Sequence, residues 1–365
     1  MNSFKYIQPL NKYKKKSDLE FPTIAWIKKI PKTDIHVHLG GSMRITTLID
    51  EAKRQKIKLP SYNIETLKKL VIKENALDLE EYLKAFHLTE SVMKSERTLK
   101  RVAFELVVDC VSENVRLLEV RFAPTNYVTP KLKLPQIIEA VLEGLDAGKK
   151  YCKEKLKKRI HVGLIVCGIR TDKSATEEAV RIAINYYGQG VVGFDIAGAE
   201  YGHRPKELEK VCMPVFKHHV PVTIHAGEAY GAKSISESLV YLRAKRIGHG
   251  THVLGSTLLV REANTSRLPF EVCISSNVHT KTIPSIQAHP IRQMMMRGLR
   301  VCINTDNRLV SNTNITKEMY LLVNHLGFRK GDLKKLVKNG VKAAFIDKDT
   351  TDEILTEFDT SLDLL

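Results

Sequence analysis

The chain has 365 residues, 43% hydrophobic and 27% charged, so it can bury a sizeable core and is not of the disordered class. Its formal net charge of +17 makes anionic ligands worth testing, but basic and aromatic residues are not interleaved as in a nucleic-acid-binding surface. No apolar stretch approaches the roughly 20 residues that span a bilayer. We therefore expect neither a nucleic-acid nor a membrane partner.

The N-terminal residues 1–29 read as a polar arm, with a basic run at Lys14, Lys15 and Lys16 and no long apolar segment typical of a secretory signal. The six cysteines are scattered and form no CxxC pair, which indicates reduced thiols and predicts a cytoplasmic protein. Residues 30–365 show no interdomain linker and are expected to form a single catalytic domain. Nothing in the sequence specifies an oligomeric state.

Eight short apolar runs rich in β-branched residues alternate with longer helical patterns. The predicted strands, in chain order, are Thr33–Leu39, Leu117–Phe122, Ile160–Ile169, Val191–Ala197, Val220–His225, Arg246–Gly248, Phe270–Ser275 and Arg300–Asn304. Eight βα units favour an α/β fold of the (β/α)8 TIM-barrel type over an open sheet. The sixth strand is short and is the weakest of the set.

Additional helices are expected around the barrel. Leu99–Glu113 carries apolar residues at four-residue spacing and predicts a helix that covers the barrel. The connection after the first strand, residues 45–95, is long enough for a helical insertion with two or three helices. Within it, Leu79, Tyr82 and Phe86 share one helix face with Leu83, which is typical either of ordinary packing or of a lid over the substrate.

The strongest local pattern is His36 and His38 near the end of the first predicted strand. Residues i and i+2 of a strand point to the same face, so both imidazoles can enter the barrel. Two converging imidazoles suit zinc, although an HxH pair alone is a weak signal.

Two later residues strengthen the prediction. His225 ends the fifth predicted strand and Asp306 follows the eighth, and the carboxyl ends of the strands of such a barrel meet at one face. Three imidazoles and one carboxylate at three strand ends form a plausible zinc-binding set. Taken singly, each could be a buried core histidine or a surface aspartate.

Two further residues near the same face are candidates for catalysis. Glu228 follows His225 by three residues and can exchange a proton with substrate without binding the metal. His249, after the sixth strand, can orient or deprotonate a metal-bound water. Polar loop residues also often serve only as caps, and His252 is interpreted as structural.

The segments Asp34–Gly41, Glu119–Pro124, Gly193–Gly198, His225–Glu228, Gly248–Gly250, Ser276–Val278 and Asn304–Asn307 resemble, in order and spacing, those of the adenosine deaminase family of metal-dependent hydrolases. The resemblance extends from about residue 30 to 346. Each piece is weak on its own, but together they are highly specific.

The resemblance implies one Zn2+ per subunit, held by His36, His38, His225 and Asp306. Glu228 is then implied to protonate purine N1 as hydroxide attacks C6, with His249 and Asp306 orienting that hydroxide. The Gly198 backbone is implied to meet purine N3. The implied reaction releases ammonia from adenosine, and from 2'-deoxyadenosine, to give an inosine-type product in purine salvage.

Two positions depart from the family pattern. At Gly40, family members commonly carry an Asp that binds the ribose 5'-hydroxyl, so water or another group must hold this hydroxyl or the pocket must admit a 5'-substituent. At Asn307, many relatives have an Asp that donates to purine N7, and an Asn amide can still donate there.

These departures leave a second hypothesis, a deaminase of a related 6-aminopurine such as adenine, 5'-methylthioadenosine or N6-modified AMP. A third hypothesis is a non-catalytic barrel that binds nucleosides or a protein. A non-catalytic barrel should lack some of the metal-binding or catalytic residues. In this sequence, every expected ligand and catalytic position carries a residue able to perform that role.

Overall fold

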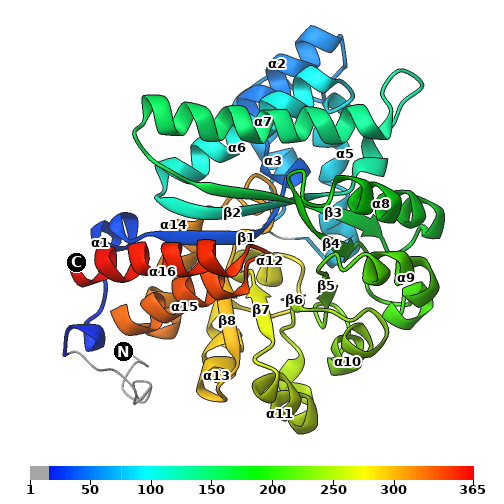
Figure 1. Ribbon diagram of the computed structural model, residues 1–365. Helices are drawn as coiled ribbons and strands as arrows, with labels where there is room; N and C mark the ends of the chain where they lie inside the picture. The colour runs from blue at the N-terminus through cyan, green and yellow to red at the C-terminus, as the bar shows by residue number, and fades with distance from the viewer. Residues whose placement is uncertain (1–15, 75) are drawn as a thin grey trace.

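The computed structural model describes residues 16–74 and 76–365 as an α/β barrel (Figure 1). Its eight parallel strands are β1 (Lys32–His38), β2 (Val115–Phe122), β3 (His161–Ile169), β4 (Val191–Ala197), β5 (Thr223–Ala226), β6 (Arg246–His249), β7 (Pro269–Val272) and β8 (Arg300–Ile303). All eight predicted strands are present, including the sixth. The strands are almost wholly buried, as expected when helices cover one face and the barrel interior lies on the other.

The strands form a closed ring. β1 to β4 pair in sequence order, and so do β5 to β8. Isolated bridges join these two sheets, one between Phe194 and Val222 and one between Val37 and Asp306. At the second junction, the His38 amide donates to the Asp306 carbonyl at 2.7 Å, and the Asp306 amide donates to the His36 carbonyl at 2.8 Å. Ring closure therefore fixes Asp306 beside the histidines of β1.

Helices surround the ring. Those of the barrel wall are α6 (Glu96–Ser112), α7 (Leu134–Lys155), α8 (Lys173–Tyr186), α9 (Glu209–Lys217), α10 (Ala232–Tyr241), α11 (Thr257–Thr265), α13 (Ile291–Met296), α14 (Ile315–Leu326), α15 (Lys330–Ala343) and α16 (Lys348–Asp363). α6 confirms the helix predicted at 99–113. It begins because the side chain of Ser95 caps the Thr98 amide, and it buries Val102, Leu106 and Cys110.

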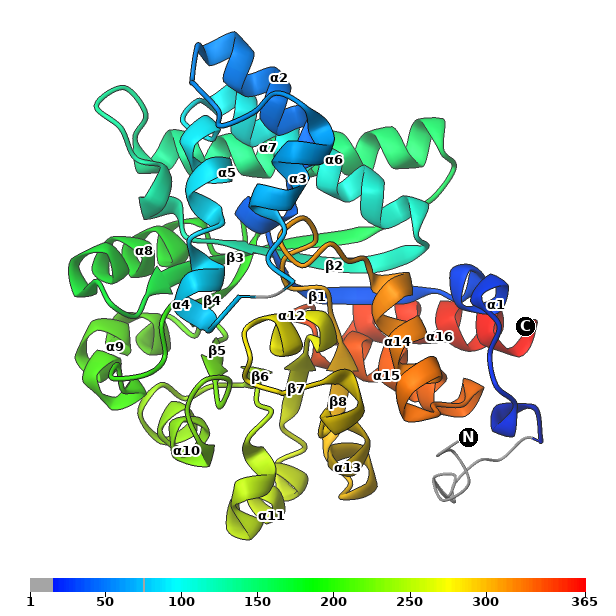
Figure 2. The same ribbon diagram turned by 180° about the vertical axis from the view of Figure 1, so that it is seen from behind.

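The insertion after β1 contains more helices than predicted. It forms α2 (Ile45–Gln55), α3 (Ile64–Val71), α4 (Leu79–Leu83) and α5 (Phe86–Val92). The single helical face predicted over residues 79–86 is split between α4 and α5, because the chain turns at Lys84 and Ala85. Figure 2 shows α4 and α12 (Ile274–His279) over one end of the ring, with α5 leading away from α4.

The seventh strand ends earlier than predicted. The seventh was expected to reach Ser275, but β7 ends at Val272 and α12 begins at Ile274. The α12 start is held by Glu318, whose carboxylate accepts the Ser275 amide at 3.1 Å. A short apolar run fits a strand or a helix equally well, and this tertiary contact decides between them.

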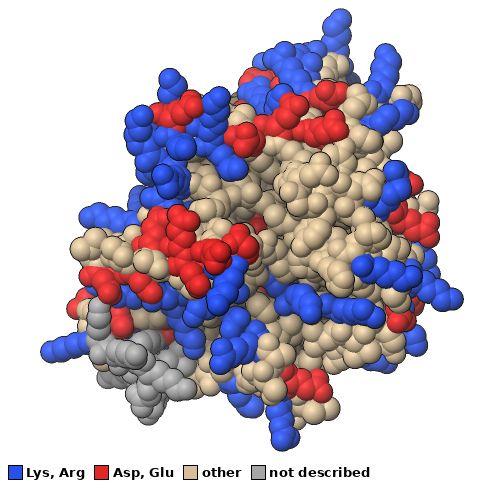
Figure 3. All heavy atoms as spheres, in the orientation of Figure 1, with Lys and Arg blue, Asp and Glu red and all other residues tan. Residues whose placement is uncertain are grey.

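The predicted arm, residues 1–29, lies partly outside the described residues, as does most of its basic run. Its described part includes α1 (Ile24–Lys29), which buries Trp26 and Ile27. On the face shown in Figure 3, Lys and Arg are dispersed among acidic and uncharged side chains. In the part of the chain that the structure describes, no helix is long and apolar enough to span a membrane.

Candidate metal centre and substrate cavity

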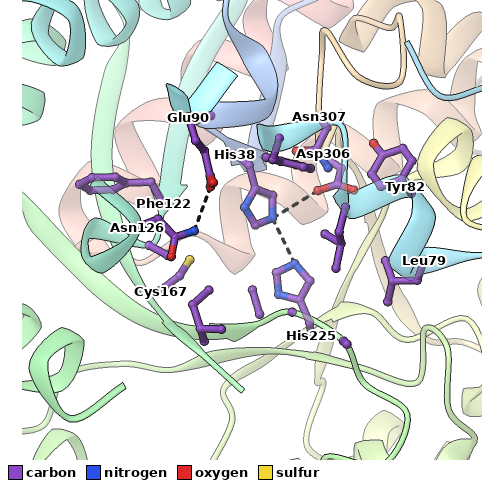
Figure 4. Close-up of a pocket in the computed structure, with 18 of the residues that line it drawn as sticks. His38, Leu79, Tyr82, Glu90, Phe122, Asn126, Cys167, His225, Asp306 and Asn307 are labelled. Carbon is purple, nitrogen blue, oxygen red and sulfur yellow. Dashed lines mark hydrogen bonds and ion pairs between the residues drawn. The ribbon is translucent and has the colours of Figure 1, made fainter. Parts of the chain in front are cut away.

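The four predicted metal ligands come together at the carboxyl ends of the strands. His36 and His38 belong to β1, His225 lies in β5 and Asp306 follows β8. One ligand atom from each lies within 4.8 Å of all the others. The Nε2 atoms of His38 and His225 are 3.1 Å apart, and His38 Nε2 is 3.3 Å from Asp306 Oδ1. Figure 4 shows His38, His225 and Asp306 pointing toward one another.

Two buried carboxylates orient these imidazoles from behind. Glu271 Oε2 lies 2.9 Å from His36 Nδ1, and Asp195 Oδ2 lies 3.0 Å from His225 Nδ1. Arg121 links the two carboxylates, with one nitrogen 2.8 Å from Asp195 and another 2.9 Å from Glu271. Each carboxylate accepts the Nδ1 proton, so the two Nε2 lone pairs face inward. The motifs around Asp195 and Arg121 were noticed in the sequence, but this orienting role was not predicted.

The donor set fits a metal ion. His36 Nε2 is fully buried and makes no hydrogen bond, which is costly unless another ligand satisfies its lone pair. The Asp306 carboxyl has a pKa below its usual range, because its electrostatic interactions with His36 and the other nearby imidazoles outweigh the effect of burial, so it is ionised. Three inward nitrogens and one carboxylate oxygen match the ligands that zinc prefers.

Glu228 lies in the same cavity and is buried. Burial, followed by the charges of Asp306 and Glu200, raises the pKa of the Glu228 carboxyl well above its usual range. A carboxyl with a raised pKa can act as a general acid. Its Oε2 atom lies 3.6 Å from Nε2 of His249, which ends β6.

The Glu228 loop is anchored by a residue that sequence reasoning missed. The buried Glu200 carboxylate accepts four successive backbone N–H groups: those of Gly227 at 2.6 Å, Glu228 at 3.0 Å, Ala229 at 2.7 Å and Tyr230 at 2.9 Å. The chain can turn its amides toward one point because Gly227 has a φ of +64°. Glu200 follows the quoted Gly193–Gly198 segment by only two residues, which was the one available signal.

Two site residues have unusual backbone conformations. Asp306 and His249 both have φ near +60°, which is uncommon for residues other than glycine. Such conformations persist only where the surroundings impose them, and here β1 pairs with Asp306 on one side. The strain turns both side chains from the ends of their strands into the cavity.

A cavity of about 310 Å³ adjoins the metal centre. It is lined by the predicted site residues His38, Gly40, Gly198, His225, Glu228, His249, Asp306 and Asn307. His36 lies behind them, fully buried. The insertion supplies an apolar wall from Leu79, Tyr82 and Phe86, and Tyr82 is anchored by a 2.6 Å hydrogen bond to Ser311. The structure therefore places these insertion residues, for which the sequence left ordinary packing and a lid both open, on the cavity itself.

Polar groups also line the cavity. Glu90 of α5 accepts a hydrogen bond from the Asn126 amide at 2.9 Å (Figure 4). The Tyr127 hydroxyl lies against Gly40. None of these three was predicted, because they come from the insertion and from the loop after β2. Among the residues that the structure describes, no Lys or Arg lines the cavity.

Comparisons with known proteins agree with this arrangement. The chain is 38% identical to an adenosine deaminase of Clostridium botulinum, over 91% of this chain and 97% of that protein. The structure superposes on an Arabidopsis N6-mAMP deaminase with a TM-score of 0.78 and 26% identity, covering 92% of this chain and 99% of the other. A zinc-bound amidohydrolase from Burkholderia ambifaria shares the fold, with a TM-score of 0.83, 22% identity and 93% coverage of both chains.

The sequence profile described as adenosine deaminase matches residues 31–361, nearly the whole described barrel. That span includes all four clustered ligands as well as Glu228 and His249. The chain therefore belongs to the adenosine deaminase family.

Proposed function

We propose that this protein is a zinc-dependent adenosine deaminase, which converts adenosine and water to inosine and ammonia and also accepts 2'-deoxyadenosine. The observation that carries the proposal is that the buried Glu228 carboxyl, whose pKa burial raises well above its usual range, lies in one cavity with a cluster of three histidines and one aspartate. The Clostridium botulinum relative, named adenosine deaminase, supports it.

One Zn2+ per chain is the proposed metal, held by His36, His38, His225 and Asp306. When bound, zinc supplies Lewis-acid activation of water near neutral pH. Zinc in the Burkholderia amidohydrolase is in keeping with this choice. Nitrogen-rich sets with one carboxylate are typical of zinc and unlike the all-oxygen sets of magnesium or calcium.

The remaining steps, proton transfer and purine binding, are assigned to residues of the chain. Glu228 donates its proton to purine N1 as a water that has given up one proton to solvent adds through its oxygen to C6, which lets C6 become tetrahedral without a charge on the ring. The proton of the new hydroxyl group then moves to the departing amine, and Glu228 is reprotonated from solvent. Asn307 Oδ1 faces Gly41, which leaves the amide nitrogen to donate to purine N7. The backbone at Gly198, with φ of +100°, is the proposed contact for purine N3. Loss of ammonia from C6 completes the exchange of an amine for an oxygen.

The cavity favours a nucleoside over a nucleotide. A 5'-phosphate is normally bound by Arg, Lys or clustered backbone amides, and no Arg or Lys of the described chain lines this cavity. The Glu90 carboxylate lies there instead and repels a phosphate when ionised. The 26% identical Arabidopsis relative acts on N6-mAMP, so AMP derivatives are the comparison that matters most.

The test is the ultraviolet absorbance change on deamination, measured with metal-replete and chelator-stripped protein. Adenosine, AMP and 5'-methylthioadenosine are assayed side by side. Metal-dependent turnover of adenosine with little turnover of AMP is expected. Turnover of AMP or 5'-methylthioadenosine alone would transfer the function to a related 6-aminopurine, and no turnover of any of the three would contradict the proposal.

We also propose a cytoplasmic location and a role in purine nucleotide metabolism. The six cysteines are all free and buried, as is typical of a reducing compartment. The only partner that the site calls for is a small-molecule purine nucleoside. Fractionation with a cytoplasmic marker tests the location.

A further inference from the structure

His249 has two distinct environments on its imidazole ring. Its Nε2 atom faces the cavity, 3.6 Å from Glu228 Oε2. Its Nδ1 atom faces away from the cavity, 3.0 Å from the amide nitrogen of Asn277 in α12. A neutral imidazole carries one proton, and its position decides whether Nε2 donates or accepts a hydrogen bond. Asn277 and its neighbours determine that position.

The position of the His249 ring proton can be derived from His289, which contacts Asn277 on the side opposite His249. The Ile291 backbone N–H donates to His289 Nδ1 at 3.1 Å, so that nitrogen carries a lone pair. Burial lowers the pKa of His289 to about 3, which keeps its ring neutral near pH 7. The single ring proton therefore resides on Nε2, which lies 3.3 Å from Asn277 Oδ1 and donates to it.

This hydrogen bond from His289 fixes the orientation of the Asn277 side-chain amide. Because its carbonyl oxygen accepts from His289, its amide group must face His249, and the amide can only donate. His249 Nδ1 is thereby the acceptor and carries a lone pair. The neutral His249 ring then has its proton on Nε2, directed into the cavity toward Glu228.

We propose that Asn277 and His289 are positioning residues that hold His249 as the Nε2–H tautomer, so that His249 donates a hydrogen bond to the oxygen attacking C6 and does not remove its proton. This inference rests on the proposed deaminase function for the identity of that oxygen. It decides between the two roles that the sequence leaves open for His249, orienting or deprotonating the water. Preorganised donors of this kind lower the barrier because they need no reorganisation as charge develops.

The tautomer is directly measurable without turnover. Protein labelled with 15N-histidine gives long-range 1H–15N correlations that distinguish a protonated ring nitrogen from one with a lone pair, and loss of signals in His249→Gln assigns the His249 ring. We expect Nε2–H and an unprotonated Nδ1 for both His249 and His289. A proton on His249 Nδ1 would overturn the proposal, whether or not the protein deaminates adenosine.

Asn277→Asp inverts the polarity at one position while keeping side-chain shape. A carboxylate accepts from both neighbours, so the His249 proton should move to Nδ1 and the donor into the cavity should be lost. We expect kcat for adenosine to fall about 100-fold to 1000-fold, the magnitude for loss of one preorganised donor, with KM and zinc content little changed. Unchanged kcat together with a moved proton would contradict the catalytic part of the proposal.

His289 provides a matched pair of variants. His289→Gln brings an amide donor near the former Nε2 position and should preserve the His249 tautomer and most of kcat. His289→Leu removes the donor, frees the Asn277 amide to rotate and should lower kcat about fivefold, since a buried hydrogen bond contributes roughly 1 kcal/mol. Equal losses in the two variants, with the same melting temperature, would show that His289 acts only through packing. Wild-type protein that shows the expected tautomer but deaminates nothing would instead contradict the proposed function.

Discussion

The hydroxyl of Tyr127 occupies the space next to Gly40 where a side chain would otherwise project. A Cβ atom built on Gly40 would lie 2.7 Å from that oxygen, but 4.0 Å from the ring carbon that bears it. Both residues line the substrate cavity. A neutral phenol from the loop after β2 therefore lies beside the position at which the family resemblance implies a carboxylate. A side chain at position 40 would require this phenol to shift.

Tyr127→Phe tests whether this phenol contacts the ribose. We expect KM for adenosine to rise about fivefold, because one neutral hydrogen bond contributes roughly 1 kcal/mol. KM for 5'-deoxyadenosine, which lacks the 5'-hydroxyl, should change little. Steady-state kinetics with both nucleosides give the ratio, and an equal effect on the two would assign the 5'-hydroxyl to another group.

Gly40→Asp alone should lower activity, because its side chain collides with the Tyr127 hydroxyl. Adding Tyr127→Phe removes the oxygen at 2.7 Å and leaves the ring carbon at an ordinary contact distance. The double variant should regain activity and should discriminate more strongly than wild type against AMP and 5'-methylthioadenosine, since a carboxylate repels phosphate and crowds a larger substituent. A double variant no better than Gly40→Asp would mean that the collision is not the cause.

Glu228→Gln should retain fold and metal but lose turnover. The amide has nearly the same shape but cannot deliver an acidic proton to purine N1. We expect kcat to fall by a factor of about 100 to 10,000, the range for loss of general acid catalysis. Zinc content by mass spectrometry and the melting temperature serve as controls. Retained turnover would remove Glu228 from the mechanism.

His225→Ala should lower metal content as well as rate, because it removes one of the inward Nε2 ligands. Metal affinity should weaken by at least about 100-fold, more than the loss of an outer-shell partner causes. His218→Ala is the matched control, since His218 is exposed on the barrel surface. Zinc stoichiometry is measured for both variants after dialysis against a chelator, and it should fall in His225→Ala but not in His218→Ala. Equal stoichiometry in both variants would refute the ligand assignment.

The barrel and the clustering of the four candidate metal ligands were predictable because they follow simple periodic rules. Alternation along β1 places His36 and His38 on one face, and parallel strands bring His225 and Asp306 to the same end. These predictions need only the identity of a residue and its position at the end of a strand. The split between α4 and α5 was missed because one apolar face continues across the turn at Lys84 and Ala85.

The supporting residues could not be predicted in the same way. Glu200 acts through four amides, which converge only because Gly227 adopts a positive φ. Asn277 and His289 form a chain of hydrogen bonds to His249 that depends on where α12 begins. Loop conformation and tertiary contacts set these geometries, and a single sequence carries no periodic signal for either.

Glu200→Gln should separate the anchoring of Glu228 from the fold around it. A glutamine has one acceptor oxygen and no charge, so part of the four-amide anchor is lost. We expect kcat to fall about 10-fold to 100-fold, because hydrogen bonds to a charged group contribute roughly 1.5–3 kcal/mol. The control is Glu237→Gln, since Glu237 is also a buried carboxylate but pairs with Arg204.

The same Glu200→Gln variant should also shift the pH dependence of kcat/KM. The negative charge of Glu200 raises the pKa of Glu228. In the proposed mechanism the Glu228 proton is the one donated to purine. Activity should therefore be lost as pH rises through the Glu228 pKa, and without the charge at position 200 that pKa becomes lower. The alkaline limb of the kcat/KM profile should move to lower pH in Glu200→Gln and stay in place in Glu237→Gln. An unmoved limb with lowered kcat would leave Glu200 with an anchoring role alone, because its charge would then not act on Glu228.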